Sequence, residues 1–224
     1  MERERDSVTG RVAGDVHGDD AHGGVMIDVV LKVGGALMRD LATLDRAARE
    51  LGRLRRDARI VLVPGGGLFA DAVREVDRRL RLGDDAAHWM AVLAMDQYAH
   101  ILAARVPAAR VVEDPADLDT AFGRGLVPVL APYRWLRRAD PLPHSWDVTS
   151  DSIAVWIASS LHAKYLVLLK PEVGPPGEVT DPHFAHALSG ANATAPIVRV
   201  CTASDATVVV ASLAISSADR DRPD

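Results

Sequence analysis

The sequence has little cysteine, few aromatic residues and no long apolar run. Its 224 residues include one cysteine, Cys201, and only 4% aromatic side chains. A single cysteine excludes a disulfide framework within the chain and a zinc site built on several cysteines, and it is typical of a reducing compartment. No apolar run reaches the roughly 18 residues that a membrane-spanning helix needs. We therefore expect a cytoplasmic protein.

Basic residues are also in the minority. The chain has 26 Lys plus Arg against 31 Asp plus Glu, which gives a formal net charge of -5. Nucleic-acid and anionic-membrane binders normally carry a basic face, so this balance argues against both kinds of partner. The remaining composition, 48% hydrophobic and 25% charged, is that of a globular protein with a substantial core.

The two ends of the chain differ from its middle. Residues 1–25 are charged and Gly-rich, without the apolar stretch of a signal peptide, and we expect a flexible extension there. Met26 directly precedes the first apolar segment and offers an alternative start of translation. Residues 216–224 are expected to form a polar tail, which leaves 26–215 as a single domain.

Strand-like and helix-like segments alternate through that domain. Residues 26–35 and 58–67 are apolar runs that end in glycines, typical of strands buried on both faces. Helical spacing of apolar residues is found at 40–57, 68–82 and 84–106. Further along we expect strands at 109–114, 126–133, 164–170 and 196–203, helices at 115–125, 151–163 and 183–190, loops at 134–150 and 171–182, and a strand or a helix at 206–215.

This alternation predicts an α/β fold, a three-layer αβα sandwich with a mostly parallel central sheet. Ligands of such sheets bind beyond the carboxyl ends of the strands. At the first of these ends Lys32 lies shortly before Gly34 and Gly35. Glycines allow a turn whose N–H groups face an anion, and the lysine adds a positive charge. The alternative is a plain turn with a lysine reaching the edge of the sheet.

The second segment is VPGGGLFAD, in which a strand, a glycine turn and a helix follow one another. The turn consists of Gly65, Gly66 and Gly67, and the helix that follows can place a phosphate at its N-terminus. The spacing matches neither a dinucleotide-binding fingerprint nor a Walker A loop. A bare glycine turn is the alternative.

The third segment, LPHSWDVTSDSIAVWIA, combines a histidine, an aromatic residue and two carboxylates before a helix. Asp147, Thr149 and Asp151 are spaced two residues apart, so their side chains would face the same way in an extended loop. Asp151 alone could be explained as the N-cap of the helix. An N-cap does not account for His144, Trp146 and Asp147, which together favour a site for a small cationic or polar ligand.

Residues 26–174 resemble the amino acid kinase family, which includes carbamate, acetylglutamate and uridylate kinases. The matching segments are KVGGA, VPGGG and DVTSD, in that order. More narrowly, LPHSWDVTSDSIA, AMDQYAHIL and VLAPY resemble the branch that makes furan diphosphates for methanofuran-type cofactors.

The resemblance implies a kinase that transfers the γ-phosphoryl group of ATP to a small phosphomonoester, an aminomethylfuran phosphate. Such an acceptor is already an anionic nucleophile, so the enzyme must position two anions rather than supply a general base. Mg²⁺ would be held by phosphates and water, and no metal ligand of the protein is expected. The resemblance further implies an acceptor-binding half at 26–150, a shortened nucleotide-binding half at 151–215, and a homo-oligomer with the helix around 86–104 as a candidate interface.

The same resemblance assigns roles to single residues. Lys32 would contact the transferring phosphoryl group, Lys170 would supply a second cation, and Asp151 would orient both lysines. The N–H groups of the glycines would hold phosphates: Gly34, Gly35, Gly65, Gly66 and Gly67.

Acceptor recognition is expected from the third segment. Asp147 would bind the aminomethyl group, with Thr149 on the same side of the loop and Trp146 or His144 against the furan ring. Arg74 is a candidate for the acceptor's phosphate and equally a solvated arginine.

The sequence departs from the family pattern after the strand at 164–170. Pro171 and Glu172 replace the usual Asp-containing segment, and no lysine follows Lys170. Two alternatives therefore stay open beside the kinase with a furan acceptor. One is a family member with another acceptor, and the other is a binding protein that has lost ATP.

Overall fold

The computed structural model describes residues 26–54 and 58–218. The extension expected at 1–25 and the end of the tail, 219–224, lie outside the described residues. Within the described part, no helix is both long enough and apolar enough to cross a membrane.

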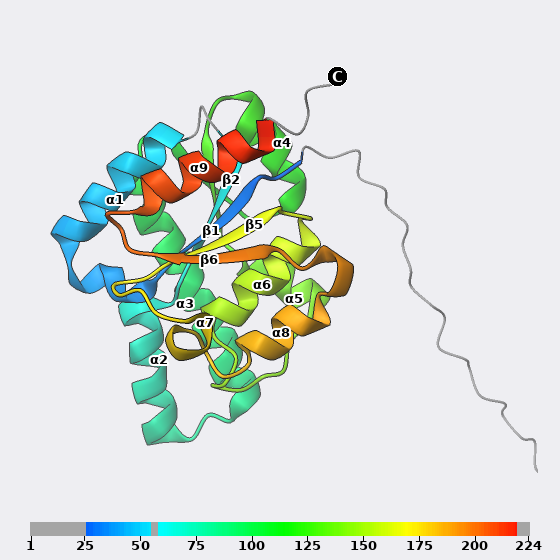
Figure 1. Ribbon diagram of the computed structural model, residues 1–224. Coiled ribbons are helices and arrows are strands. Elements are labelled where there is room, and N and C mark those ends of the chain that lie inside the picture. The colour runs from blue at the N-terminus through cyan, green and yellow to red at the C-terminus, as the bar shows by residue number, and fades with distance from the viewer. Residues whose placement is uncertain (1–25, 55–57, 219–224) are drawn as a thin grey trace, which may run out of the picture.

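The centre of the fold is a six-stranded sheet in which every strand pair is parallel, in the order β3-β4-β2-β1-β5-β6 (Figure 1). The strands are β1 (Val29–Val33), β2 (Ile60–Pro64), β3 (Ala109–Val112), β4 (Val127–Leu130), β5 (Tyr165–Leu169) and β6 (Ile197–Cys201). All residues of β1, β2, β4 and β5 are buried, as expected for strands covered on both faces.

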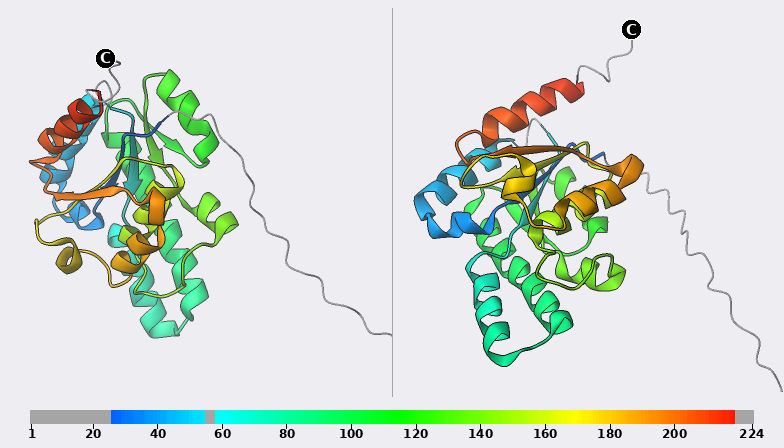
Figure 2. Two further views of the ribbon diagram at one scale, coloured as in Figure 1. Left: turned by 45° about the vertical axis from the view of Figure 1, so that its right-hand side comes forward. Right: turned by 60° about the horizontal axis from the view of Figure 1, so that its bottom comes forward.

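Helices cover both faces of the sheet, which confirms the predicted three-layer sandwich (Figure 2). They are α1 (Leu41–Leu54), α2 (Gly67–Leu80), α3 (Asp84–Arg105), α4 (Leu118–Gly123), α5 (Tyr133–Ala139), α6 (Ser150–Ser160), α7 (Pro176–Val179), α8 (Phe184–Gly190) and α9 (Ala206–Ala218), with short 3₁₀ turns η1 (Gly35–Arg39), η2 (Pro115–Asp117) and η3 (Asn192–Thr194).

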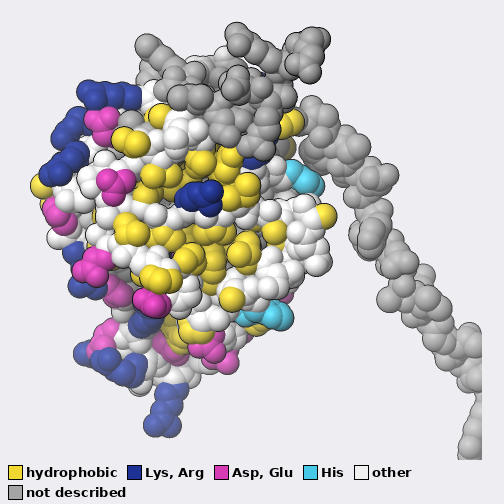
Figure 3. Space-filling model, viewed as in Figure 1, with side chains coloured by type: hydrophobic (Ala, Val, Ile, Leu, Met, Phe, Trp, Pro, Cys, Tyr) yellow, Lys and Arg dark blue, Asp and Glu magenta, His cyan; other side chains and the backbone are white. Residues whose placement is uncertain are grey.

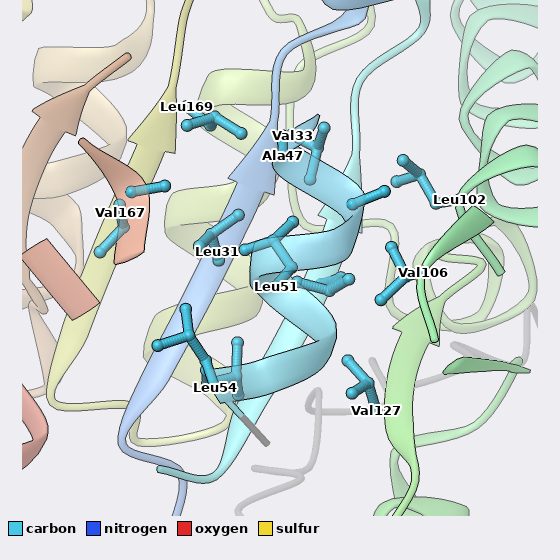
Figure 4. Packing of buried hydrophobic residues seen from close by; sticks show 14 of the residues in the cluster. Leu31, Val33, Ala47, Leu51, Leu54, Leu102, Val106, Val127, Val167 and Leu169 are labelled. Atoms are coloured by element: carbon cyan, nitrogen blue, oxygen red, sulfur yellow. The ribbon is translucent and has the colours of Figure 1, made fainter. Parts of the chain in front are cut away.

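Side-chain alternation along the strands divides the core into two layers. Val29, Leu31 and Val33 of β1 pack with α1 and α9 on one face (Figure 4). Val30 points to the other face, where the core is built with α4, α5, α6 and α8. Each fully buried aliphatic side chain stabilises the fold by about 1.5–3 kcal/mol. Lys32 has the parity of Val30, and this parity directs it towards the α6 face.

Three predicted segments differ from the structure. Helix α5 begins at Tyr133, the last residue of a predicted strand, and occupies the start of the segment expected to be a loop at 134–150. Leu136 is buried there, and Trp135 packs on Trp156 with ring centroids 4.5 Å apart. The segment at 206–215, left open as strand or helix, is helix α9, which runs on to Ala218 within the expected tail. Helix α7 lies in the segment expected to be a loop at 171–182. The remaining strands and α-helices lie within the predicted ranges or differ by a residue or two at their ends.

One edge of the sheet is formed by β6. Apolar side chains gather in the middle of the face that Figure 3 shows, where Figure 1 draws β6. Ile197 of this strand is 49% exposed, so part of this apolar surface is accessible to solvent.

Helices α2 and α3 pack on each other as a hairpin, which projects from the body of the molecule at the lower end in Figures 1 and 2.

Candidate active site

The candidate site lies where the order of the sheet reverses. From β1 the chain continues to β2 on one side, whereas β5 is the neighbour on the other side. Lys32 is the next-to-last residue of β1, and Lys170 directly follows β5. Both lysines are therefore at the carboxyl ends of adjacent parallel strands, at the position where open α/β sheets bind ligands.

Lys32 and Lys170 converge on one carboxylate. Lys32 Nζ lies 2.8 Å from Asp151 Oδ1, and Lys170 Nζ lies 2.7 Å from Asp151 Oδ2. Lys32 and Asp151 are 3% and 4% exposed. The contact of Lys170 is a well-formed hydrogen bond, whereas Oδ1 has Lys32 as an ionic partner without good hydrogen-bond geometry. The structure thus brings the three predicted catalytic residues together, with one net positive charge.

The electrostatics of this cluster follow from burial and charge. Burial alone would raise the pKa of Asp151, but the two lysines outweigh it and hold that pKa below its ordinary value. Burial, together with the charge of Lys32, lowers the pKa of Lys170 despite the opposing effect of Asp151. Two ammonium groups are thereby kept close to one point by one carboxylate.

Asp151 is held by the N-terminus of α6, but it does not cap that helix. Thr149 is the N-cap residue, and Asp181 supplies the capping carboxylate from the loop between α7 and α8. Asp181 Oδ2 accepts hydrogen bonds from Thr149 N, Thr149 Oγ1 and Ser152 N at 2.8–3.0 Å, and Oδ1 accepts one from Ser152 Oγ at 2.5 Å. Asp151 is therefore free to bind the lysines.

The two glycine turns pack against each other beside this cluster. A Cβ atom on Gly35 would overlap the backbone of Gly67, whose φ of +56° also favours glycine. Gly34 N–H donates to Leu169 O and Gly65 N–H donates to Val33 O, both at 2.9 Å. These two N–H groups continue the sheet and are not available to a phosphate, which corrects the role expected of them.

Three other N–H groups remain suited to an anion. Gly35 begins η1, Gly67 begins α2, and Gly66 is the N-cap residue of α2. The first N–H groups of a helix have no acceptor within it, and the helix dipole adds positive potential there. Gly35, Gly66 and Gly67 line the cleft described next.

A cleft of about 270 Å³ opens above the lysines. Its floor is Lys32, Asp151 and Lys170, and the glycine turns and the N-terminus of α6 form its walls. Residues of α2, α3 and the 145–149 loop line the remainder, among them Ala70, Asp71, Arg74, Asp84, Ala87, His88, Ala91, Met95, Trp146 and Thr149.

Trp146 and Arg74 form one wall of this cleft. The Arg74 guanidinium stacks over the indole ring at 4.6 Å from its centroid, and Trp146 Nε1 donates to Asp77 Oδ2 at 2.8 Å. Asp71 Oδ1 lies 3.4 Å from Arg74, and Asp71 Oδ2 lies 2.6 Å from Arg39. The structure therefore brings Arg74, Trp146 and Thr149 together in one cleft.

Asp147 and His144 lie outside the cleft. The Asp147 side chain is exposed, and the backbone carbonyl of Asp147 accepts a hydrogen bond from His183 N–H. Alternation along the loop does not hold because it turns at residues 145–148 instead of running extended. His144 bridges Asp85 and Asp140, with both ring nitrogens 2.8 Å from carboxylate oxygens. These positions correct the expected contacts of both residues with the acceptor.

His88 is the cleft residue that sequence reasoning missed. It is 7% exposed, lines the cleft and stacks on His144 with ring centroids 4.2 Å apart. Burial, followed by the charge of His144, lowers the pKa of His88 to about 4. Its position within the apolar helix α3 makes it read as a core residue, so the sequence carried no signal for it.

No group of three or more His, Cys, Asp or Glu side chains in 26–54 and 58–218 could hold a metal ion.

Comparisons with known proteins support the same assignment of fold. A model of the amino acid kinase family matches residues 29–173. A [5-(aminomethyl)furan-3-yl]methyl phosphate kinase of Methanocaldococcus jannaschii is 28% identical over 139 residues, which cover 62% of this chain and 63% of that protein. The match thus spans less than two thirds of that relative.

Two solved structures share the fold. A uridylate kinase from Archaeoglobus fulgidus has a TM-score of 0.60 at 16% identity, covering 82% of this chain and 95% of that one. A UMP kinase from Ureaplasma parvum has a TM-score of 0.58 at 14% identity, covering 80% of this chain and 90% of that one.

Proposed function

Because this chain belongs to the amino acid kinase family, we propose that it transfers the γ-phosphoryl group of ATP to the phosphate of a small phosphomonoester. The observation that carries the proposal is the buried arrangement in which Lys32 and Lys170 share Asp151 on the floor of the cleft. Fixed cations in a site that excludes water stabilise the charge that develops during phosphoryl transfer.

The charges of the cleft fit two anionic substrates. Two lysines and the N-terminus of α2 surround the point where the phosphates would meet, and Asp151 lies between the lysines. Farther along the cleft, Arg39 and Arg74 balance the charges of Asp71 and Asp84. Lys170 would contact the nucleotide, and Lys32 the transferring group. A phosphomonoester oxygen is already ionised, so the transfer requires alignment of two anions and no general base.

The proposed acceptor is [5-(aminomethyl)furan-3-yl]methyl phosphate, which would become its diphosphate. The name of the Methanocaldococcus jannaschii relative supports it. The acceptor part of the cleft supports it as well, because small side chains of α2 and α3 leave space beside Trp146 for a flat ring. Arg74, which stacks on Trp146, would meet the phosphate of this acceptor.

ATP and Mg²⁺ enter the proposal as substrate and as its accompanying ion. The site fits the phosphates of the nucleotide because Lys32 and Lys170 lie together on the floor of the cleft. Mg²⁺ bound to the nucleotide would supply charge neutralisation on the phosphate oxygens. A homo-oligomer stays a prediction, and most apolar residues of α3 are already buried within the chain.

A binding protein without catalysis is the second candidate, and the segment after Lys170 favours it. Pro171, Glu172 and Val173 are exposed and contribute little to the cleft, of which only Pro171 is a part. Such a protein would keep the acceptor cleft and bind nucleotide weakly or not at all.

Coupled measurement of ADP release separates the candidates. We expect release with MgATP and the furan phosphate, and a loss of about 10²–10³-fold in kcat for Lys32→Ala because a preorganised cation is removed. Thermal unfolding with MgATP provides the second readout, since a ligand of the folded state raises Tm by mass action. No ADP release with any phosphate acceptor, together with no Tm shift at millimolar MgATP, would refute the kinase proposal.

A further inference from the structure

His88 combines two properties that rarely occur together. Its side chain is buried, and no hydrogen bond joins either ring nitrogen to another residue in the described part of the chain. Among the described residues, the fully buried side-chain N and O atoms without a hydrogen-bond partner are Trp89 Nε1, Tyr98 Oη and Asp151 Oδ1, so the ring nitrogens of His88 keep contact with solvent. The ring lines the acceptor part of the cleft, so a bound ligand is within its reach.

The surroundings of His88 fix the ring in place. His144 stacks on it with an interplanar angle of 15°, and Trp89 packs edge-on at 4.8 Å between ring centroids. His144 is itself clamped between Asp85 Oδ1 and Asp140 Oδ1. A ring that is packed on one side and clamped through its neighbour has few rotamers, and it can present one nitrogen at a defined place.

The local charges indicate which kind of group would bind there. Besides burial, the charge of His144 lowers the pKa of His88, whereas the negative charges of Asp140 and Asp85 oppose this lowering. With a pKa of about 4, the imidazole is uncharged near neutral pH and keeps one nitrogen as a hydrogen-bond acceptor. A group that donates hydrogen bonds and carries positive charge suits both features.

We propose that His88 is a specificity-determining residue, which accepts a hydrogen bond from the cationic amino group of the acceptor, and that His144 positions its ring. The proposal rests on the proposed function, because the amino group belongs to the acceptor inferred there. The amine would thus be recognised by His88 of α3 and not by Asp147, which faces solvent.

Calorimetric titration in the absence of nucleotide tests the proposal independently of catalysis. The ligands are [5-(aminomethyl)furan-3-yl]methyl phosphate and its analogue with a hydroxymethyl group in place of the aminomethyl group. His88→Phe keeps an aromatic ring for the stack on His144 but removes both nitrogens. We expect about tenfold weaker binding of the amine, the usual size of a hydrogen bond to a charged group, and little change for the analogue.

Two further variants complete the test. His88→Asn retains a side-chain acceptor and should recover part of the preference for the amine. His100→Phe makes the same substitution at an exposed position of α3 outside the cleft and should leave both affinities unchanged. If His88→Phe weakens the binding of both ligands equally, or of neither, His88 does not recognise the amino group. Either result would overturn the proposal.

His144 calls for a different readout because it acts through His88. His144→Phe keeps the stack but breaks the contacts with Asp85 and Asp140. We expect a higher KM for the aminated acceptor, with KM for ATP and kcat unchanged. If His144→Phe leaves the ratio of the two acceptor affinities unchanged, the positioning role fails. Selective amine binding without ADP release would refute only the kinase proposal, whereas turnover without amine preference would refute only this one.

Discussion

Lys32 and Lys170 reach opposite oxygens of one buried carboxylate from the ends of two neighbouring parallel strands. Their register follows from the sheet, since Lys32 pairs with Leu168 and Lys170 comes two residues later. Two ammonium groups would repel each other in a buried site, and Asp151 makes their proximity possible. The sheet supplies the positions, and α6 supplies the charge that stabilises them.

Asp151→Ala should therefore be more destabilising than Lys32→Met. Removing the carboxylate leaves two buried ammonium groups without a counter-ion, which costs about 3–5 kcal/mol. Lys32→Met leaves Asp151 paired with Lys170 and preserves most of the side-chain volume. Urea unfolding of both variants at pH 7 measures the difference. A larger loss for Lys32→Met would mean that Asp151 does not organise the cluster.

Asp181→Ala tests the cap that holds Asp151 in place. The change removes four hydrogen bonds at the N-terminus of α6, and we expect a loss of about 1–2 kcal/mol of stability. Activity should fall as well, because Asp151 lies in the first turn of that helix. Asp147→Ala, an exposed carboxylate just before α6, is the matched control in both unfolding and ADP-release assays. Equal behaviour of the two variants would contradict the role of Asp181.

Local pattern was sufficient for the sheet, and the floor of the site required the family resemblance as well. Apolar runs that end in glycines predicted β1 and β2, and their carboxyl ends located Lys32 and both glycine turns. The family resemblance added Asp151 and Lys170. Each of these features depends on residues that are close in sequence or on a rule that holds for every parallel sheet.

Residues that act across distant segments could not be predicted. Asp181 caps a helix that begins about thirty residues earlier in the chain, and no periodicity links the two. The N–H groups of Gly34 and Gly65 are occupied by backbone hydrogen bonds to neighbouring strands, and only the register of the strands reveals this. His88 faces the cleft because α2 and α3 pack as a hairpin, a tertiary feature that the apolar pattern of α3 conceals.

Gly35→Ala should disrupt both glycine turns. The new Cβ would overlap the backbone of Gly67, and neither backbone can move without displacing β1 or α2. We expect a loss of about 1–3 kcal/mol of stability together with weaker substrate binding. Gly123→Ala is the control, because a Cβ there meets nothing within 4 Å. Thermal unfolding of both variants provides the measurement, and a neutral Gly35→Ala would show that the turns are not in contact in solution.

The buried ring of His88 predicts a pH dependence of stability with a definite sign. Because burial lowers its pKa to about 4 from an ordinary value of 6.5, the unfolded chain takes up a proton between these values and the folded chain does not. The contribution of His88 is therefore fully present above pH 6.5 and is lost as the pH falls towards 4. Relative to His88→Asn, the wild-type protein should lose about 2 kcal/mol between pH 7 and pH 4.5.

Asp96 provides a control of opposite sign for this measurement. Burial raises its pKa to about 6, while its backbone contact with Tyr133 N–H opposes the shift. The folded chain then keeps a proton that the unfolded chain releases, so the contribution of Asp96 is lost as the pH rises towards 6. Urea unfolding of wild type, His88→Asn and Asp96→Asn at pH 4.5, 5.5 and 7 separates the two effects. A difference between wild type and His88→Asn that does not change with pH would show that the ring of His88 is accessible to protons in the folded state.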